Sequence, residues 1–328
     1  MIHETSRRRL LPLIAGFAAS LCLPALAQTD GFPNRPIRLV VPFAAGGNTD
    51  VGARLLAQGL ALEFNQSVVV DNKVGAGTIV GTEDVARAKP DGYTLLLTTI
   101  AYAVNPSLYK NLRYDSKKDL VPVAHVSSSA PLLLLHPSVP ASNIPQLVDY
   151  LKKNPGTSYG SAGNGSAMHL HGELFRMQTS APITHIPYKS ESPALVDLIA
   201  GRTMFHFGGI SSSAQYVKSG ALKAIAIPSQ KRTPLLPDVP TAEEAGLPGF
   251  LAYTWSVVLA PAGTPPAIID RLNAAMNKVS SSPEVNAKLV ALGYEPITDS
   301  TPASTGRHIA SETVKWGEVV KRGNLTVD

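Results

Sequence analysis

Residues 37–60 read IRLVVPFAAGGNTDVGARLLAQGL, and this stretch decides the fold. The apolar run Ile37–Val41 predicts a buried strand, and the apolar spacing after Val51 predicts a helix. Between them lies a loop with two adjacent glycines, Gly46 and Gly47. The first N–H groups of a helix have no partner within it, and glycine lets an anion approach them closely. The loop therefore suits a carboxylate or phosphate, although Gly and Asn also occur in such turns simply because they reverse the chain.

The N-terminus carries the features of an export signal. Arginines at 7–9 precede an apolar, alanine-rich run from 13 to 26, and Ala25-Leu26-Ala27 matches an A-x-A cleavage pattern. We predict that residues 1–27 are a signal peptide and that the mature protein is periplasmic. The paired arginines fit the twin-arginine route, but Pro12 stands where lysine is usual, so the Tat and Sec routes both stay open.

The composition excludes several classes of protein. The only cysteine, Cys22, would leave with the signal, so the mature protein would have no disulfide. No later run is long and apolar enough to span a bilayer, so we expect no stable membrane insertion. Charged residues make up 16% of the chain, the formal net charge is +5, and no dense Lys/Arg block follows the signal. We therefore expect no nucleic-acid partner.

The pattern of strand, glycine loop and helix occurs a second time. A strand that ends at Tyr159 is followed by a loop at Gly160–Ser166 and a helix at Ala167–Met177. Alternating strands and helices over this length predict an α/β protein with two lobes. We expect each lobe to be a mostly parallel sheet flanked by helices. Ligands of such sheets bind where strands end, which predicts a cleft between the lobes and two hinge crossings.

The last third of the chain sets the expected division into domains. Three helical patterns follow Pro265 and could complete the first lobe. We assign residues 28–127 and 255–328 to lobe 1 and residues 128–254 to lobe 2. A short helix is also expected at Thr241–Ala245.

The glycine loops do not match the motifs of common enzymes. The segment Gly75–Gly81 places its third glycine one residue late for a dinucleotide fingerprint, and Gly163–Met168 ends in Met. No loop contains the lysine of a P-loop, and neither Ser161 nor Ser166 lies in G-x-S-x-G. We therefore predict a protein that is not an enzyme, with no cofactor; an exported cofactor-binding enzyme is the competing interpretation.

Two histidines follow the second glycine loop. His169 and His171 are two residues apart on a predicted helix, where they point to different sides and make a poor metal pair, so we expect no metal site. His169 lies in the first turn and could donate to an anion there. We expect His171 to be a surface or packing residue.

Short motifs along the chain occur in the order seen in one family. They include Pro42-Phe43-x-x-Gly46-Gly47-x-x-Asp50, Pro90-Asp91-Gly92-Tyr93, Asn105-Pro106-Ser107-Leu108-Tyr109, Tyr159-Gly160-Ser161-Ala162-Gly163-x-Gly165-Ser166, Pro187-Tyr188-Lys189 and Leu259-Ala260-Pro261-Ala262-Gly263. The chain resembles the Bug-type substrate-binding proteins of the tripartite tricarboxylate transporter family over essentially its whole mature length.

This resemblance implies a monomeric periplasmic receptor that closes on a small carboxylate. The expected ligand is a dicarboxylate, a tricarboxylate or an aromatic carboxylate, which the receptor delivers to a cognate inner-membrane permease. A receptor that signals to a membrane sensor is the alternative.

The resemblance also implies most of the ligand-binding residues. The first glycine loop would hold one carboxylate through backbone groups and water, and the segment after the third strand and the second glycine loop would add contacts. The predicted ligand-binding residues are Phe43, Ala44, Ala45, Gly46, Gly47, Thr49, Asp50, Thr98, Thr99, Ala101, Tyr102, Ser161, Ala162, Gly163, Asn164, Gly165, Ser166, His169, Tyr188 and Gly208.

One departure from the family pattern bears on specificity. Many relatives carry Asp at the strand end where this chain has Gly208, and an Asp there could pair with a ligand amine. Because glycine cannot, we expect amino acids to be poorer ligands than plain or aromatic carboxylates. We also expect Gly208 and Gly209 to leave room for a ring.

Overall fold

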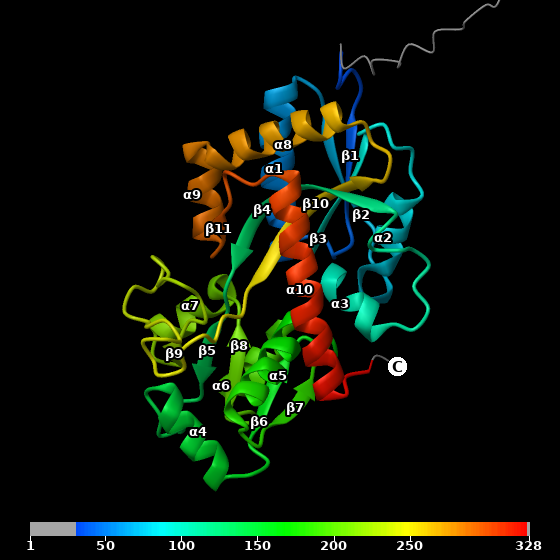
Figure 1. Cartoon of the computed structure of the whole chain (residues 1–328). Coiled ribbons are helices and arrows are strands. Elements are labelled where there is room, and N and C mark those ends of the chain that lie inside the picture. The colour runs from blue at the N-terminus through cyan, green and yellow to red at the C-terminus, as the bar shows by residue number, and fades with distance from the viewer. Residues whose placement is uncertain (1–30, 327–328) are drawn as a thin grey trace, which may run out of the picture.

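The computed structural model describes residues 31–326, so the predicted signal peptide lies outside the described residues. Two mixed β-sheets, each covered by helices, form two lobes joined by long strands (Figure 1). This arrangement confirms the prediction of a two-lobed α/β fold.

The first lobe contains a six-stranded sheet of order β11-β4-β10-β3-β1-β2. Its strands are β1 (Ile37–Val41), β2 (Val68–Asn72), β3 (Thr94–Thr99), β4 (Leu120–Ser129), β10 (Thr254–Pro261) and β11 (Glu295–Pro296). One face is covered by α1 (Asn48–Phe64), α8 (Pro266–Ser281) and α9 (Pro283–Ala291). The helices α2 (Ile79–Ala86, after the 3-10 turn Ala76–Thr78), α3 (Ala101–Leu108) and α10 (Pro302–Gly323) pack on the other face.

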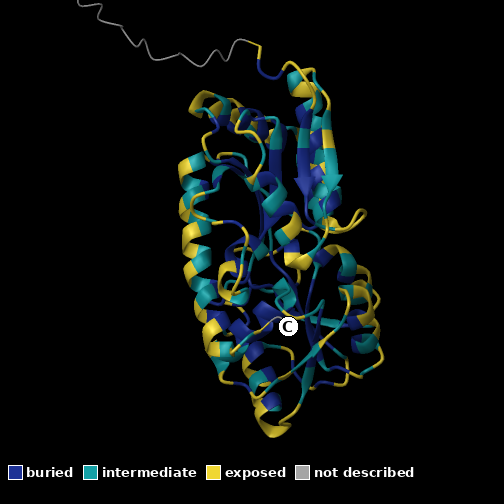
Figure 2. Cartoon of the chain, turned by 90° about the vertical axis from the view of Figure 1, so that its right-hand side faces the viewer, coloured by how far each residue is buried: buried dark blue, intermediate teal, exposed yellow. Residues whose placement is uncertain are grey.

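The second lobe contains a five-stranded sheet of order β7-β6-β8-β5-β9. Its strands are β5 (Leu132–Leu135), β6 (Ser158–Ser161), β7 (Thr184–Pro187), β8 (Phe205–Gly208) and β9 (Lys223–Ala226). Its helices are α4 (Ile144–Lys153), α5 (Ala167–Thr179), α6 (Glu191–Ile199) and α7 (Ile210–Lys218). In both lobes the central strands are mostly buried, the edge strands β2 and β7 are partly exposed, and the outer helix faces are exposed (Figure 2).

The sheets are mixed, but in each of them most strands run in one direction, as expected. Strands β10 and β11 run against the other four of the first sheet, and β5 runs against the other four of the second. In the first lobe β1 is parallel to β2 and β3, whereas β10 is antiparallel to both β3 and β4. In the second, β6 is parallel to β7 and β8, but β5 is antiparallel to β8 and β9. The reason is the connection between lobes. Strand β4 carries the chain out of the first lobe and β10 carries it back, so the two run in opposite directions.

The expectation of a short helix at Thr241–Ala245 was wrong. This segment is a turn held by backbone bonds to the end of β9, with the N–H of Ala242 donating to the carbonyl of Ile227 at 2.8 Å. Gly246, with φ +95°, then ends the turn in a conformation that no helix continues.

Helix α10 contacts both lobes. It packs against α3 and β4 in the first lobe and against α5 in the second, and Figure 1 shows it running from one lobe to the other. On its inner face, Glu312 accepts hydrogen bonds from two buried indoles. Nε1 of Trp316 donates at 2.7 Å and Nε1 of Trp255, at the start of β10, donates at 2.9 Å. The carboxylate of Glu312 thus links α10 by a hydrogen bond to β10, one of the strands that cross between the lobes.

Replacing Glu312 should destabilise the whole protein. Glu312→Ala leaves two buried indole N–H groups without an acceptor, and we expect a loss of about 2 to 4 kcal/mol in the free energy of unfolding. Urea denaturation followed by tryptophan fluorescence measures this. Glu318→Ala, at an exposed position of the same helix, is the matched control and should change stability little. Equal stability of the two variants would contradict the role given to Glu312.

Candidate ligand-binding site

A cavity of about 200 Å³ lies between the two lobes. Both lobes and both strand crossings contribute to its wall. The lining residues are Asn48, Thr49 and Tyr294 from the first lobe, Ser129, Ala130, Pro131 and Thr254 from the crossings, and Ala167, Met168, His171, Glu191, Phe207 and Gly209 from the second. Among these residues only Glu191 has a charged side chain at neutral pH.

Helices from both lobes begin at this cavity. Asn48 and Thr49 are the first residues of α1, and Ala167 and Met168 are the first residues of α5. Among the described residues, no acceptor binds the N–H groups of these four residues, because the intrahelical bonds start later in each helix. The positive ends of two helices therefore face the same space from opposite sides.

The first glycine loop is held in shape by the buried carboxylate of Asp50. It accepts hydrogen bonds from the backbone N–H of Gly46 at 2.8 Å, from Nε of Arg54 at 2.9 Å and from Nδ2 of Asn72 at 2.8 Å. Burial opposes ionisation, but these donors outweigh it and lower the pKa of Asp50. Gly46, with φ +81°, adopts the left-handed conformation that the turn requires.

The other predicted residues of this loop are accessible. Phe43 is half-buried, and Ala44, Ala45, Gly46 and Gly47 are exposed. Of the seven loop residues in the prediction, Thr49 lines the cavity. The other six are not among its lining residues and stay a prediction as ligand contacts.

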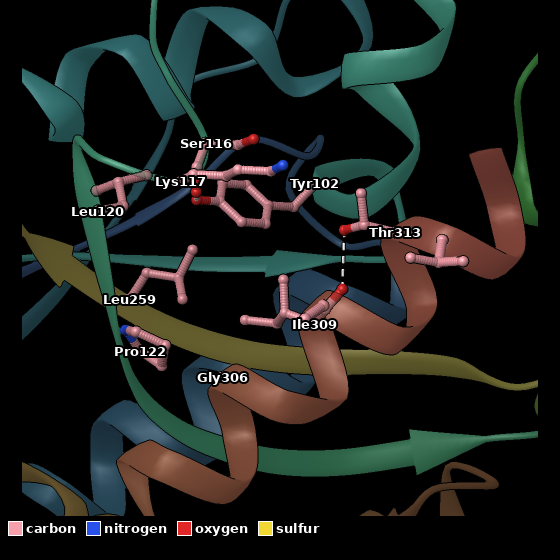
Figure 3. Close-up of a pocket in the computed structure, with 11 residues that line it drawn as sticks. Tyr102, Ser116, Lys117, Leu120, Pro122, Leu259, Gly306, Ile309 and Thr313 are labelled. Carbon is pink, nitrogen blue, oxygen red and sulfur yellow. Dashed lines mark hydrogen bonds between the residues drawn. The ribbon is translucent and has the colours of Figure 1, made fainter.

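The segment after β3 lies mainly inside the first lobe. Thr98 and Thr99 are buried, Ala101 is half-buried and Tyr102 is buried. The Tyr102 hydroxyl donates to the carbonyl of Ser116 at 2.6 Å, and its ring stacks on Tyr114. Figure 3 shows the ring beside a separate, largely apolar cavity of about 360 Å³ beneath α10. The structure therefore does not bring Tyr102 to the cavity between the lobes.

The second glycine loop is fixed by histidines. Ser161 is fully buried, and its Oγ accepts from the N–H of Gly163 at 3.0 Å and lies 2.6 Å from Nε2 of His185. His169 stacks on His185 at 3.8 Å, and its Nδ1 accepts from the N–H of Gly165 at 3.1 Å. Burial lowers the pKa of each histidine to about 4. The side chains of Ser161 and His169 thus shape the loop.

The remaining second-lobe residues of the prediction surround this loop. Ala162, Gly163, Gly165 and Ser166 are half-buried, and Asn164 is exposed. The N–H of Tyr188 donates to the carbonyl of Ser161 at 3.0 Å, and its hydroxyl donates to Asp197 at 2.7 Å. Tyr188 is therefore a support for the loop in this structure.

Gly208 leaves no free space, so the room expected there for a ring was wrong. A Cβ at this position would lie 2.7 Å from both Cδ1 of Leu134 and Oγ of Ser213. Glycine at this position instead allows β8 to pack closely against β5 and the first turn of α7.

Glu191 was not predicted as a site residue. An acidic residue in the first turn of a helix is common because it stabilises the helix, so its position in α6 alone did not mark it. In the structure its Oε1 accepts from the N–H of Gly209 at 2.7 Å and from Oγ of Ser212 at 2.8 Å. His206 Nε2 lies 3.8 Å away. Burial opposes ionisation, but His206, the Gly209 N–H and the Ser212 hydroxyl outweigh it and lower the pKa of Glu191.

His171 is buried at the cavity wall, so of the two roles expected for it, surface or packing, the packing role is confirmed. It packs against Phe207 and Trp316, and neither ring nitrogen has a partner at hydrogen-bond geometry among the described residues. Burial and the charge of Lys315 lower its pKa to about 3, against a weaker opposing effect of the Tyr253 carbonyl. His171 is therefore a neutral polar group at the cavity.

Two α/β lobes, two strand crossings and a cavity between the lobes define the class of two-lobed solute-binding proteins. The sequence places the chain within this class. A family model described as the tripartite tricarboxylate transporter family receptor matches residues 52–325, and the chain belongs to this family.

Individual relatives agree with this assignment. The protein BugT of Bordetella pertussis is 39% identical, over 95% of this chain and 97% of that protein. An R. palustris protein solved with adipate is 34% identical, with a TM-score of 0.79 over 90% of this chain and 100% of the other. MatC from Rhodopseudomonas palustris, solved with bound malate, is 32% identical, with a TM-score of 0.75 over 88% of this chain and 100% of the other.

Two further properties of residues 31–326 bear on membrane insertion and on metal binding. No helix within residues 31–326 is long and apolar enough to cross a membrane. In the same part of the chain, no group of three or more His, Cys, Asp or Glu side chains is placed to hold a metal ion.

Asp50 should contribute stability that depends on pH. Its carboxyl has a pKa of 3.8 in the unfolded chain and a lower one in the folded protein, so its contribution is present above about pH 4. That contribution is lost as the pH falls through the folded pKa. Asp50→Asn should therefore be less stable than the wild type by about 1 to 3 kcal/mol at pH 7, and the difference should shrink in acid.

Thermal unfolding between pH 2.5 and pH 7 measures the effect of Asp50→Asn. Asp270→Asn, at an exposed position of α8, is the matched control and should follow the wild type throughout. A difference between Asp50→Asn and the wild type that stays constant over this range would refute the charge-based role.

Proposed function

We propose that this protein is an extracytoplasmic solute receptor that binds a small carboxylate between its lobes and delivers it to a permease of the tripartite tricarboxylate type. The observation that carries the proposal is that α1 and α5 start on opposite walls of one cavity with unpaired N–H groups. Such groups bind carboxylates without needing a buried arginine. Water can relay these contacts with little loss of affinity.

The relatives support a carboxylate as ligand. Two proteins of similar sequence and fold were solved with adipate and with malate, which are both dicarboxylates. By analogy, we propose that a dicarboxylate, a tricarboxylate or an aromatic carboxylate occupies the cavity here. The protein acts in the periplasm as a monomer, and residues 1–27 direct its export.

Closure of the lobes would let a permease distinguish the ligand-bound receptor from the empty one. Nδ2 of Asn48, in α1, donates to Oγ of Ser211, in α7, at 2.8 Å and so joins the lobes across the cavity mouth. We propose that residues 28–127 and 255–328 move against residues 128–254 about the two strand crossings. A ligand that touches both walls favours the closed state because it gains more contacts there.

Carboxylates should stabilise the purified protein. A ligand at a hundred times its dissociation constant adds about 2.7 kcal/mol, which raises the unfolding temperature by several degrees. A thermal-shift screen against aliphatic dicarboxylates, citrate, acidic amino acids and benzene dicarboxylates measures this. The absence of any shift across the whole panel would contradict the proposal.

The glycine loops should be required for affinity. Gly46→Val and Gly163→Val place a side chain where φ is +81° and +113°, and the second also brings a Cβ to 3.2 Å from the Tyr188 carbonyl. Each should weaken binding of the best carboxylate at least about tenfold. Gly156→Val is the matched control, because φ is +91° there but the position lies in the turn before β6, away from the cavity. If all three variants bind equally well, the loops are not the site.

Two other functions can be separated from this one. A receptor that informs a membrane sensor would leave uptake intact on gene deletion and abolish induction by the ligand. An exported enzyme would be purified with a stoichiometric cofactor such as a flavin or a nucleotide.

A further inference from the structure

We propose that Glu191 and His171 form a second subsite in the cavity that binds a protonated amine. The preferred ligand is then a carboxylate that also carries an ammonium group. This inference rests on the proposed carboxylate receptor and specifies its ligand. It reverses the expectation drawn from Gly208, because the negative charge that Gly208 lacks is supplied by a different element, α6.

The first argument is the charge of the cavity. Glu191 is the only charged side chain among the lining residues at neutral pH, and no lysine or arginine is among them. A plain dicarboxylate would bring a second negative charge toward this carboxylate in a partly buried space, which is unfavourable. An ammonium group in the same place would neutralise it.

The second argument is that only one carboxylate oxygen of Glu191, Oε1, accepts hydrogen bonds from the described residues. Oε1 accepts both the Gly209 N–H and the Ser212 hydroxyl, and this suffices to cap the start of α7. Among the described residues no donor contacts Oε2. The side chain is 21% exposed and lines the cavity, so this oxygen can accept a hydrogen bond from a bound molecule.

The third argument comes from His171, independently of Glu191. Buried polar groups in folded proteins nearly always have a hydrogen-bond partner, yet both nitrogens of this buried ring lack one. The ring lies one turn after Ala167 on the same face of α5, and both residues line the cavity. As a neutral imidazole it can accept an N–H from a ligand, which would satisfy one of the two nitrogens.

Within residues 31–326, His206 is the basic side chain that lies within 4 Å of the Glu191 carboxylate and could compete for this role. Its Nδ1 contacts the carbonyl of Gly160 at 2.8 Å, which places a proton on that nitrogen. Its Nε2 is 3.8 Å from Oε1 of Glu191, beyond hydrogen-bond length. This separation leaves Glu191 without a direct hydrogen bond from His206.

The test compares three ligands that share one carbon chain. Succinate, malate and aspartate carry H, OH and NH3+ at the same carbon, and isothermal titration gives the affinity of each. For the wild type we expect aspartate to bind at least about tenfold more tightly than succinate, because a site built around a hydrogen-bond acceptor discriminates strongly against ligands that lack the donor.

Glu191→Gln removes the charge but keeps an acceptor for the α7 cap. It should bring the affinities for aspartate and succinate within about threefold of each other. His171→Leu keeps the packing against Phe207 and Trp316, and should weaken aspartate but not succinate. Glu284→Gln, in the exposed first turn of α9, is the matched control and should retain the wild-type preference. Unfolding temperatures establish that each variant is folded.

The outcomes separate this inference from the proposed function. If no carboxylate binds the wild type, the proposed function itself fails. If carboxylates bind but succinate equals or exceeds aspartate, His206 or another group already neutralises Glu191, and the inference is overturned while the receptor stands. Retention of the aspartate preference in both Glu191→Gln and His171→Leu also overturns it.

Discussion

The antiparallel pair of β4 and β10 is the interaction on which the rest of the structure depends. The two strands run side by side from Ser129 opposite Thr254 to Leu120 opposite Pro261, in the middle of the first sheet. The same strands are the two connections to the second lobe. Their ends, Ser129 and Thr254, line the cavity, so the element that organises the first core also fixes where the lobes meet.

Helix α10 reinforces this position. Glu312 receives the indole of Trp255 from β10 and that of Trp316 from its own helix, and Trp316 in turn contacts His171 at the cavity wall. Contacts thus run without a gap from the crossing strand, through the outer helix, to a ligand-facing residue of the second lobe.

Much of the polar chemistry near the site serves the loops themselves. In the first loop, the carboxylate of Asp50 accepts hydrogen bonds from Gly46, Arg54 and Asn72. In the second loop, the hydroxyl of Ser161 is hydrogen-bonded to Gly163 and His185. Because these side chains hold the loops, the N–H groups at the helix starts are left for a ligand. Under the function proposed above, a preformed site of this kind would recognise carboxylates in general, and selection among them would fall to the second-lobe wall.

The sequence predicted local elements well where one periodicity dominated. Both glycine loops lie between a strand and a helix, as expected. Tyr102 was placed in the site because the family resemblance implied it, yet its ring turns into the first-lobe core. Which way a side chain points after a strand depends on packing against α10, which follows in the chain by about two hundred residues.

By itself the sequence determined the α/β class and the two strand, loop and helix units, because these depend on neighbouring residues. Only the tertiary structure decided that the sheets are mixed and that Leu134 and Ser213 occupy the space beside Gly208. It also decided that Glu191 and His171 line the same cavity. Those facts arise from contacts between segments far apart in the chain. No local pattern of residues encodes the free space or the charge that such contacts leave.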